Sequence, residues 1–327
     1  MNWRNERVLV TGAGGFIGSH LTERLVQSGA EVRAMVQYNG RGDDGWLTTS
    51  ALRDDIEIVA ADVRDRDAVA KAMQGVTVVF HLAALIAIPY SYQCPQSYLD
   101  TNIMGTLNVL LAARDLGTAT VVHTSTSEVY GTARYVPIDE NHPLQGQSPY
   151  SASKIGADKL AESFHLSFGV PVVTVRPFNT FGPRQSARAV IPTIVTQALQ
   201  SNRIKLGHLE PTRDFNYVSN TVDGFVRAAE VPAAVGQVVN LGSGAEISIG
   251  DLARLIGALT GAQLDIETDP ARLRPPASEV DRLLADTSRA GELLGWHPAV
   301  SLRDGLVKTI AWLREHSDRY QPAQYAV

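Results

Sequence analysis

The 327-residue chain is 44% hydrophobic and 19% charged, and its formal net charge is −5. These values are typical of a globular protein with two domains, or with one large α/β domain and an added lobe. The chain has no block of like charge, which argues against a nucleic acid or an anionic membrane as a partner. Cys94 is the only cysteine, which excludes an internal disulfide and favours a cytoplasmic protein.

No segment is expected to cross a membrane. The most apolar stretch, residues 76–89, contains His81 and is too short to span a bilayer. The first seven residues lack the apolar core of a secretion signal. Because His, Cys and Asp residues do not cluster with the spacing of metal ligands, the sequence predicts no metal site.

In the first half of the chain, apolar strands alternate with helices. The pattern predicts strands at residues 7–11, 31–36, 56–62, 77–82, 120–125 and 171–176, and helices at residues 17–27, 67–73, 97–116 and 149–168. The strands are continuous Val, Ile and Leu runs, as expected where helices cover both faces of a sheet. The sequence therefore predicts an α/β fold with a Rossmann-type, doubly wound parallel sheet.

After Pro177 this rhythm breaks. Helices are expected at residues 191–200, 221–229 and 302–315, and a buried strand at 237–241 is expected to return to the sheet. We therefore predict a dinucleotide-binding domain of residues 1–176, to which residues 214–242 return. Residues 177–213 and 243–327 are predicted to form a smaller, interleaved C-terminal substrate lobe.

A glycine-rich turn joins the first strand to the first helix. Gly12, Gly15 and Gly18 let the backbone turn tightly and approach a pyrophosphate, which then lies at the positive end of the helix with Phe16 and Ile17. Such a turn also occurs without a ligand, but the strand–turn–helix context favours a dinucleotide site.

The ends of the second and third strands predict the contacts of the adenosine. The second strand ends in Gln37-Tyr38-Asn39 with Arg41 nearby, and it lacks the acid that usually binds the ribose of NAD. This favours NADP, although Gln37 can also bond a free hydroxyl of NAD. Asp62 and Val63 follow the third strand, where Asp62 is placed either to contact adenine or to cap the next helix.

Three further elements predict a reaction centre. Tyr150 and Lys154 are four residues apart, so a helix places both on one face, where the ammonium lowers the pKa of the phenol. Thr126, Ser127 and Glu128 follow the fifth strand at the carboxyl edge of the sheet, where ligands of such folds bind. A surface Tyr–Lys pair and a capping carboxylate are the alternatives without function.

Several motifs together resemble the extended short-chain dehydrogenase/reductases that act on nucleotide sugars. They are Gly12-x-x-Gly15-x-x-Gly18, His81-Leu82-Ala83-Ala84, Asn102, Tyr150-x-x-x-Lys154, Arg176-Pro177-Phe178-Asn179-x-Phe181-Gly182-Pro183 and Arg213-Asp214-Phe215-x-Tyr217-Val218. The resemblance implies a tightly held NAD or NADP in contact with Leu82, Ala83 and Ala84, and a nucleoside-diphosphate sugar as substrate. It also implies a homodimer through a four-helix bundle of residues 97–116 and 149–168.

Within that family, Glu128 favours a 4,6-dehydratase over a 4-epimerase. The epimerases carry a small non-acidic residue there, whereas the dehydratases use an acid to remove the C5 proton after C4 is oxidised. Ser127 stands where many dehydratases have an Asp, so Glu128 is expected to serve as both base and acid, as in the similar GDP-mannose 4,6-dehydratases. The Ser127-Glu128-Val129-Tyr130-Gly131 sequence also resembles UDP-glucuronate decarboxylases.

The loop at residues 85–92 and the segment 177–186 resemble the UDP- or GDP-N-acetylglucosamine 4,6-dehydratases of legionaminic-acid-type pathways, which makes that reaction the predicted function. A 4-epimerase, a UDP-glucuronate decarboxylase and a non-catalytic dinucleotide sensor remain alternatives. The predicted substrate contacts are Ile88, Tyr90, Asn179, Arg213 and Arg282, because arginine forks match phosphate oxygens.

Overall fold

The computed structural model describes residues 1–40 and 42–320. Within them, seven strands form a parallel sheet in the order β10-β6-β5-β4-β1-β2-β3. The strands are β1 (Arg7–Thr11), β2 (Glu31–Val36), β3 (Ile56–Ala60), β4 (Val78–His81), β5 (Thr120–Thr124), β6 (Val172–Pro177) and β10 (Val238–Leu241). This order reverses direction beside β1, which makes the sheet doubly wound, as the sequence predicts.

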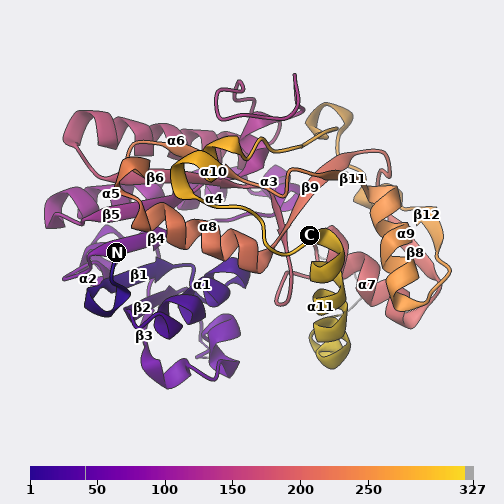
Figure 1. The fold of residues 1–327 in the computed structure, drawn as a ribbon, viewed down its shortest axis with the longest axis horizontal. Coiled ribbons are helices and arrows are strands. Elements are labelled where there is room, and N and C mark those ends of the chain that lie inside the picture. The colour runs from indigo at the N-terminus through magenta and orange to yellow at the C-terminus, as the bar shows by residue number, and fades with distance from the viewer. Residues whose placement is uncertain (41, 321–327) are drawn as a thin grey trace.

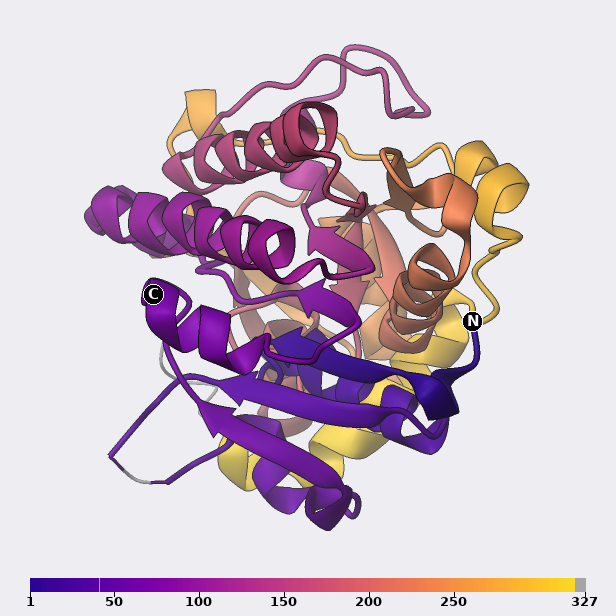
Figure 2. The same ribbon diagram turned by 90° about the vertical axis from the view of Figure 1, so that its left-hand side faces the viewer.

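Helices cover both faces of this sheet (Figure 2). One face carries α1 (Phe16–Gln27) and α8 (Val218–Glu230), and the other carries α2 (Arg66–Ala72), α5 (Gly105–Leu116) and α6 (Pro149–Phe168). Side chains alternate between the two faces along β1, with Val8 and Val10 in one core and Leu9 in the other. The continuous apolar strands of the sequence follow from these two buried faces.

The predicted long helix at residues 97–116 is wrong in one respect. The segment begins with α4 (Pro95–Tyr98), passes through π-helical geometry over Leu99–Met104, and only then continues as α5. Asn102 lies in the π-helical turn and is completely buried. Its side chain bonds the backbone of Leu85 and the hydroxyl of Ser153, and these contacts fix the irregular turn.

Much of the C-terminal part of the chain forms a lobe at the right of Figure 1, beside the carboxyl ends of the central strands, but α10 (Ser288–Leu294) packs against α8 and β10 of the central sheet domain. It contains a three-stranded sheet in the order β11-β9-β7 and a parallel pair, β12 and β8. Its elements are β7 (Asn179–Phe181), β8 (Arg203–Leu206), β9 (Thr212–Tyr217), β11 (Glu246–Ser248), β12 (Asp265–Thr268), α7 (Val190–Gln200), α9 (Ile249–Thr260) and α11 (Leu302–Glu315).

The chain crosses between the two parts more than once. β10 pairs with β6 at the edge of the central sheet, which confirms the strand predicted to return there. β9, however, pairs with β7 and β11 in the small sheet. Helix α3 (Ile88–Gln93) was not predicted and replaces the expected loop, whereas α9 and α10 lie in the region after Ile249 where small helices are expected.

Candidate active site

A cleft of about 1280 Å³ lies between the central sheet and the C-terminal lobe. Its lining comes from the ends of β1, β2, β4, β5 and β6 on one side, and from the lobe on the other. In an open parallel sheet, ligands bind at this carboxyl edge, where strand order reverses. The cleft therefore has the position of a substrate or cofactor site.

The turn after β1 provides a backbone cradle in this cleft. Gly12 adopts φ +68°, and a Cβ at that position would lie 2.9 Å from the backbone of Ala83. A Cβ at Gly18 would lie only 2.2 Å from the carbonyl oxygen of Gly12. Helix α1 begins at Phe16 without a side-chain cap, so its first N–H groups remain free for an anion. The cradle fits the pyrophosphate of a dinucleotide.

The expected adenosine contacts are only partly brought together. Gln37, Asn39, Asp62 and Val63 line the cleft, whereas Tyr38 is 73% exposed and does not. Asp62 pairs with Arg64 at 2.6 Å, and this hydrogen bond lowers the pKa of the Asp62 carboxyl. Asp65, not Asp62, caps α2, so the alternative role of Asp62 is wrong.

Arg41, the basic residue that the sequence places near the ribose, lies outside the described residues. Of the described residues at the end of β2, Gln37 and Asn39 both carry neutral amides and line the cleft.

A buried histidine holds the loop after β4 next to the cradle. Leu82 and Ala83 donate their backbone N–H groups to Thr11 Oγ1, and the Thr11 hydroxyl therefore donates to His81 Nδ1 at 2.9 Å. The Thr106 hydroxyl accepts from His81 Nε2 at 3.1 Å. Burial lowers the pKa of His81 well below its usual range, so it is a neutral structural residue. The loop it holds places Leu82, Ala83 and Ala84 in the cleft.

The five residues predicted to carry the chemistry all line the cleft: Thr126, Ser127, Glu128, Tyr150 and Lys154. The Thr126 side chain caps the short helix Ser127–Tyr130 by accepting from the Glu128 N–H at 3.2 Å. Tyr150 is hydrogen-bonded to the Thr126 side chain. The strand end and the helix therefore bring the carboxylate and the phenol to one place.

Local capping sets where helix α6 begins. Ser148 and Ser151 form a capping box, and Pro149 occupies the first turn, where its missing N–H has no cost. Tyr150 therefore leaves the first turn of the helix, and Lys154 follows one turn later on the same face.

Burial shifts the proton affinities of both groups. Burial raises the pKa of Tyr150, the hydrogen bond to Thr126 lowers it, and the negative charge of Glu128 raises it further. The pKa of the phenol is thus raised overall, against the expectation that Lys154 lowers it. The Lys154 ammonium donates to the Thr124 carbonyl at 2.5 Å, and burial lowers its own pKa to about 8.

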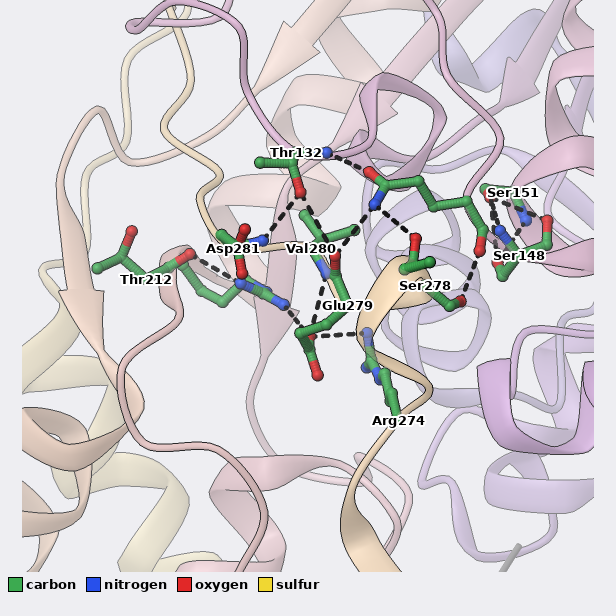
Figure 3. Close-up of polar contacts among 12 residues, drawn as sticks. Thr132, Ser148, Ser151, Thr212, Arg274, Ser278, Glu279, Val280 and Asp281 are labelled. Carbon is green, nitrogen blue, oxygen red and sulfur yellow. Dashed lines mark hydrogen bonds and ion pairs between the residues drawn. The ribbon is translucent and has the colours of Figure 1, made fainter.

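On the lobe side, a carboxylate holds two arginines that face the cleft (Figure 3). Glu279 Oε1 lies 3.2 Å from Arg213 Nη2 and 3.5 Å from Arg274 Nη1. Arg213 also donates to the Thr212 carbonyl at 3.0 Å. Burial lowers the pKa of Arg213, and the charges of Glu128 and Glu279 oppose that shift. The Arg213 guanidinium therefore lies close enough to Glu128 for their charges to interact.

The remaining predicted substrate contacts divide into two groups. Ile88, Tyr90 and Asn179 line the cleft, and Asn179 Oδ1 is a buried acceptor that has no partner among the described residues. Arg282 does not line the cleft. Its side chain is 48% exposed and pairs with Glu246, which argues for the surface salt bridge over a substrate contact.

Several lining residues were not predicted as site residues. Arg184 has φ +70° and is held by Glu23 through two hydrogen bonds of 3.0 Å. Trp46 lies against Trp312 of α11 with ring centroids 5.4 Å apart. Arg274 and Glu279 lie in the segment Arg274-Pro275-Pro276-Ala277-Ser278-Glu279, and the arginine followed by two prolines is the local signal that could have found them. The contacts of Arg184 and Trp46 join distant segments, so no local pattern reveals them.

Residues 1–40 and 42–320 contain neither a metal-binding cluster nor a membrane-spanning helix. No set of three or more His, Cys, Asp or Glu side chains is arranged to hold a metal ion there. Nor does any helix in this range combine the length and apolar character that a membrane crossing needs.

Comparison with known proteins agrees with this geometry. The family described as GDP-mannose 4,6 dehydratase matches residues 9–309. A UDP-glucose 4-epimerase of Mycolicibacterium smegmatis is 36% identical over 95% of this chain and 99% of its own length. UDP-glucuronic acid decarboxylase 1 of Xenopus tropicalis is 34% identical over 98% of this chain and 75% of its own length.

Among solved structures, the dTDP-glucose 4,6-dehydratase DesIV of Streptomyces venezuelae, crystallised with NAD and TYD, has a TM-score of 0.87. It is 29% identical over 97% of this chain and 100% of its own length. The glycine cradle, the Tyr150–Lys154 helix and the matched range lead to one assignment. The chain belongs to the GDP-mannose 4,6-dehydratase-like family of nucleotide-sugar dehydratases and epimerases, a group of extended short-chain dehydrogenase/reductases that work with a nicotinamide dinucleotide.

Proposed function

We propose that this enzyme is a nucleotide-sugar 4,6-dehydratase. The observation that carries the proposal is the position of Glu128, which shares the cleft with Tyr150 closely enough for its charge to raise the pKa of the phenol. An oxidation and reduction at C4 alone has no use for a carboxylate there. A carboxylate beside the oxidised centre can remove the acidified C5 proton.

The chain's own residues supply the proton transfers. Tyr150 takes the proton of the C4 hydroxyl, and the Thr126 hydroxyl, to which it is bonded, orients it. Lys154 places a positive charge next to this centre. The cradle of Gly12, Gly15 and Gly18 and the neighbouring Leu82, Ala83 and Ala84 would hold a nicotinamide dinucleotide, which when bound would supply the hydride acceptor for C4 and the hydride donor for C6 and would be unchanged overall. Glu128 removes the C5 proton and, because Ser127 offers no carboxylic acid, passes it to the C6 hydroxyl, which leaves as water. When a hydride is added at C6, C5 takes up the proton that Tyr150 removed from the C4 hydroxyl, so both side chains regain their starting protonation states.

For the substrate we propose UDP- or GDP-N-acetylglucosamine. Arg213 and Arg274 support a nucleoside diphosphate, because both line the cleft and guanidinium forks match phosphate oxygens. The resemblance of residues 85–92 and 177–186 supports the N-acetylated sugar. We extend the proposal to NADP on the amides of Gln37 and Asn39, and mass spectrometry of the cofactor released from purified protein tests that choice.

The product mass tests the reaction. Purified enzyme is incubated with a panel of nucleotide sugars that includes UDP-N-acetylglucosamine, GDP-N-acetylglucosamine, UDP-glucose and UDP-glucuronate. Loss of water is the expected result. An isomer of unchanged mass from UDP-glucose would replace the proposal with the 4-epimerase that the Mycolicibacterium relative favours, and loss of carbon dioxide from UDP-glucuronate would replace it with a decarboxylase. Cofactor binding without turnover of any sugar would leave a dinucleotide sensor.

We also propose a cytoplasmic homodimer. Helices α5 and α6 pack together, and an apolar set near them is 45% or more exposed: Leu99, Met104, Leu116, Leu166 and Phe168. Pairing of this face between two copies would form the four-helix bundle that the family resemblance implies. Light scattering should give twice the mass of one chain, and replacement of Leu166 by Asp should give the mass of one chain.

A further inference from the structure

A buried carboxylate lies one helical turn beyond Lys154, outside the cleft. Asp158 follows Lys154 by four residues on α6, so both side chains leave the same face of the helix. Asp158 is only 4% exposed and is not among the residues that line the cleft. A buried carboxylate is costly unless its oxygens are fully bonded, and the proposed proton transfers give Asp158 no task.

Asp158 joins the helix to the central sheet. His123 donates from Nε2 to one carboxylate oxygen at 3.0 Å, and the Ser125 hydroxyl donates to the other at 2.7 Å. Arg176 on β6 donates to that second oxygen from two nitrogens, at 3.2 and 3.0 Å. Together, these contacts connect Asp158 with two neighbouring strand ends.

Along the end of β5, the two residues that contact Asp158 alternate with the residue that contacts Lys154. His123 and Ser125 flank Thr124, and alternate residues of an extended chain point to one side. The carbonyl between them accepts the Lys154 ammonium at 2.5 Å. Asp158 and Lys154 therefore hold three consecutive residues at the end of β5. The segment with Thr126 and Glu128 begins directly after this point, so the same contacts set its position relative to Tyr150.

Asp158 also offsets the positive charges of Lys154 and Arg176 near the end of β5. Besides Lys154, the titratable and charged groups that face the region are Tyr98 on α4, Tyr150 on α6, Glu128 after β5, His81 on β4, His123 on β5 and Arg176 on β6. Burial lowers the pKa of Lys154 to about 8, and the charge of Asp158 opposes this shift. Burial acts to raise the pKa of Asp158, but the hydrogen bond from His123 and the charges of Arg176 and Lys154 lower it to about 2.

We propose that Asp158 is a positioning residue for the oxidation at C4: it fixes the end of β5 against the Tyr150–Lys154 helix and provides the counter-charge of the Lys154 ammonium. The positioning role in catalysis rests on the proposed function, whereas the effect of Asp158 on the charge of Lys154 does not. The two effects can be measured separately.

The first test titrates Lys154 directly. The chain has five lysines, so protein labelled with ¹⁵N in its lysines gives few Nζ signals, and Lys154→Arg identifies the one that belongs to Lys154. In Asp158→Asn, this ammonium should lose its proton at a pH lower by about one unit. An unchanged midpoint in a folded Asp158→Asn protein would overturn the proposal.

Glu140 offers a matched control. Its side chain is also 4% exposed and is bonded by the Asn240 N–H at 2.8 Å and paired with Arg289 at 3.6 Å. Among the residues that the structure describes, Glu140 forms no hydrogen bond or ion pair with Lys154 or Asp158. Glu140→Gln therefore removes a buried carboxylate of similar exposure and should leave the Lys154 midpoint where it is. A shift of equal size in Glu140→Gln would show a general effect of instability, and would also overturn the proposal.

Kinetics test the catalytic part. Asp158 does not line the cleft, so Asp158→Asn should lower kcat by about tenfold or more at neutral pH and leave KM within about twofold. The alkaline limb of its kcat profile should move to lower pH, in the direction of the Lys154 midpoint, and Asp158→Glu should restore part of both. An effect on KM alone would contradict a positioning role. If the wild-type enzyme turns over no nucleotide sugar, the proposed function fails and the titration still decides the charge role.

If Asp158→Asn is too unstable to titrate, a double variant keeps the proposal testable. At about pH 6, Lys154 stays charged even with a lowered pKa, and without Asp158 both Lys154 and the buried Arg176 lose the negative charge that Asp158 provides. Lys154→Met in the Asp158→Asn background should then recover part of the lost melting temperature. A double variant as unstable as Asp158→Asn itself would overturn the proposal.

Discussion

The two sides of the cleft are lined by different kinds of chemical group. On the sheet side, backbone groups form the cradle: glycines without Cβ atoms and the free N–H groups that begin α1. On the lobe side, long charged side chains face the cleft and are held by one another, as Glu279 holds Arg213 and Arg274. A backbone cradle has its shape before any ligand binds, whereas paired side chains can exchange one anion for another. The sheet side is therefore suited to a permanently held group, and the lobe side to a substrate that enters and leaves.

Glu128 belongs to the boundary between these two sides, and its replacement should have the largest effect. Glu128→Gln removes the proposed base while it keeps the size of the side chain. Dehydration should fall by about 10²- to 10⁴-fold, and cofactor binding should be unchanged because the cradle is untouched. Steady-state rates with the preferred nucleotide sugar and the amount of copurified cofactor give the two readouts. Full dehydration by Glu128→Gln would contradict its role as the base.

Gly18→Ala should disrupt the backbone cradle on the sheet side and leave the lobe side unchanged. Its added Cβ would lie 2.2 Å from the Gly12 carbonyl oxygen, a distance that forces the cradle to move. We expect cofactor affinity to fall by about tenfold or more. Calorimetric titration with NAD and NADP measures the effect. Gly117→Ala is the control, because Gly117 has φ +67° but no atom near its Cβ and lies far along the chain from the cradle.

Arg213→Lys should weaken the lobe side by a smaller amount. The lysine keeps the charge but loses the planar fork, so we expect KM for the nucleotide sugar to rise by about tenfold, which is the size of one charged hydrogen bond. Cofactor affinity should stay constant, since Arg213 belongs to the lobe. Arg282→Lys is the matched control, because Arg282 pairs with Glu246 outside the cleft. An equal rise in KM for Arg282→Lys would restore Arg282 as a substrate contact.

Glu279→Gln gives the smallest expected effect. Whether it strengthens or weakens binding of a nucleoside diphosphate tests most directly whether the lobe side exchanges one anion for another. If the carboxylate competes with the substrate diphosphate for the two arginines, its neutralisation should strengthen binding of a nucleoside diphosphate by a few-fold, about 0.5–1 kcal/mol. The dissociation constant of UDP, measured by calorimetry at low salt, tests this. Weaker binding of UDP would mean that Glu279 mainly positions Arg213 and Arg274.

Local sequence patterns predicted the sheet side well. The six strands and the glycine turn depend on neighbours in the chain, and the same is true of the Tyr150–Lys154 spacing on a helix. The errors arose where distant contacts override local preference. The π-helical turn at Asn102 exists because that side chain bonds Leu85 and Ser153. Arg282 follows the phosphate-binding pattern of an arginine, yet Glu246 pairs with it on the surface.

By itself, then, the sequence determined the class of fold, the glycine turn of the cradle and the candidates for the reacting groups, because periodicity, glycine conformation and helical spacing act over a few residues. Only the tertiary structure decided which charges meet. Glu279 and Arg213 are separated by 66 positions, and Asp158 and His123 by 35. Burial sets the charge of Lys154 and the proton affinity of Tyr150, and burial exists only once the sheet, the helices and the lobe have packed together.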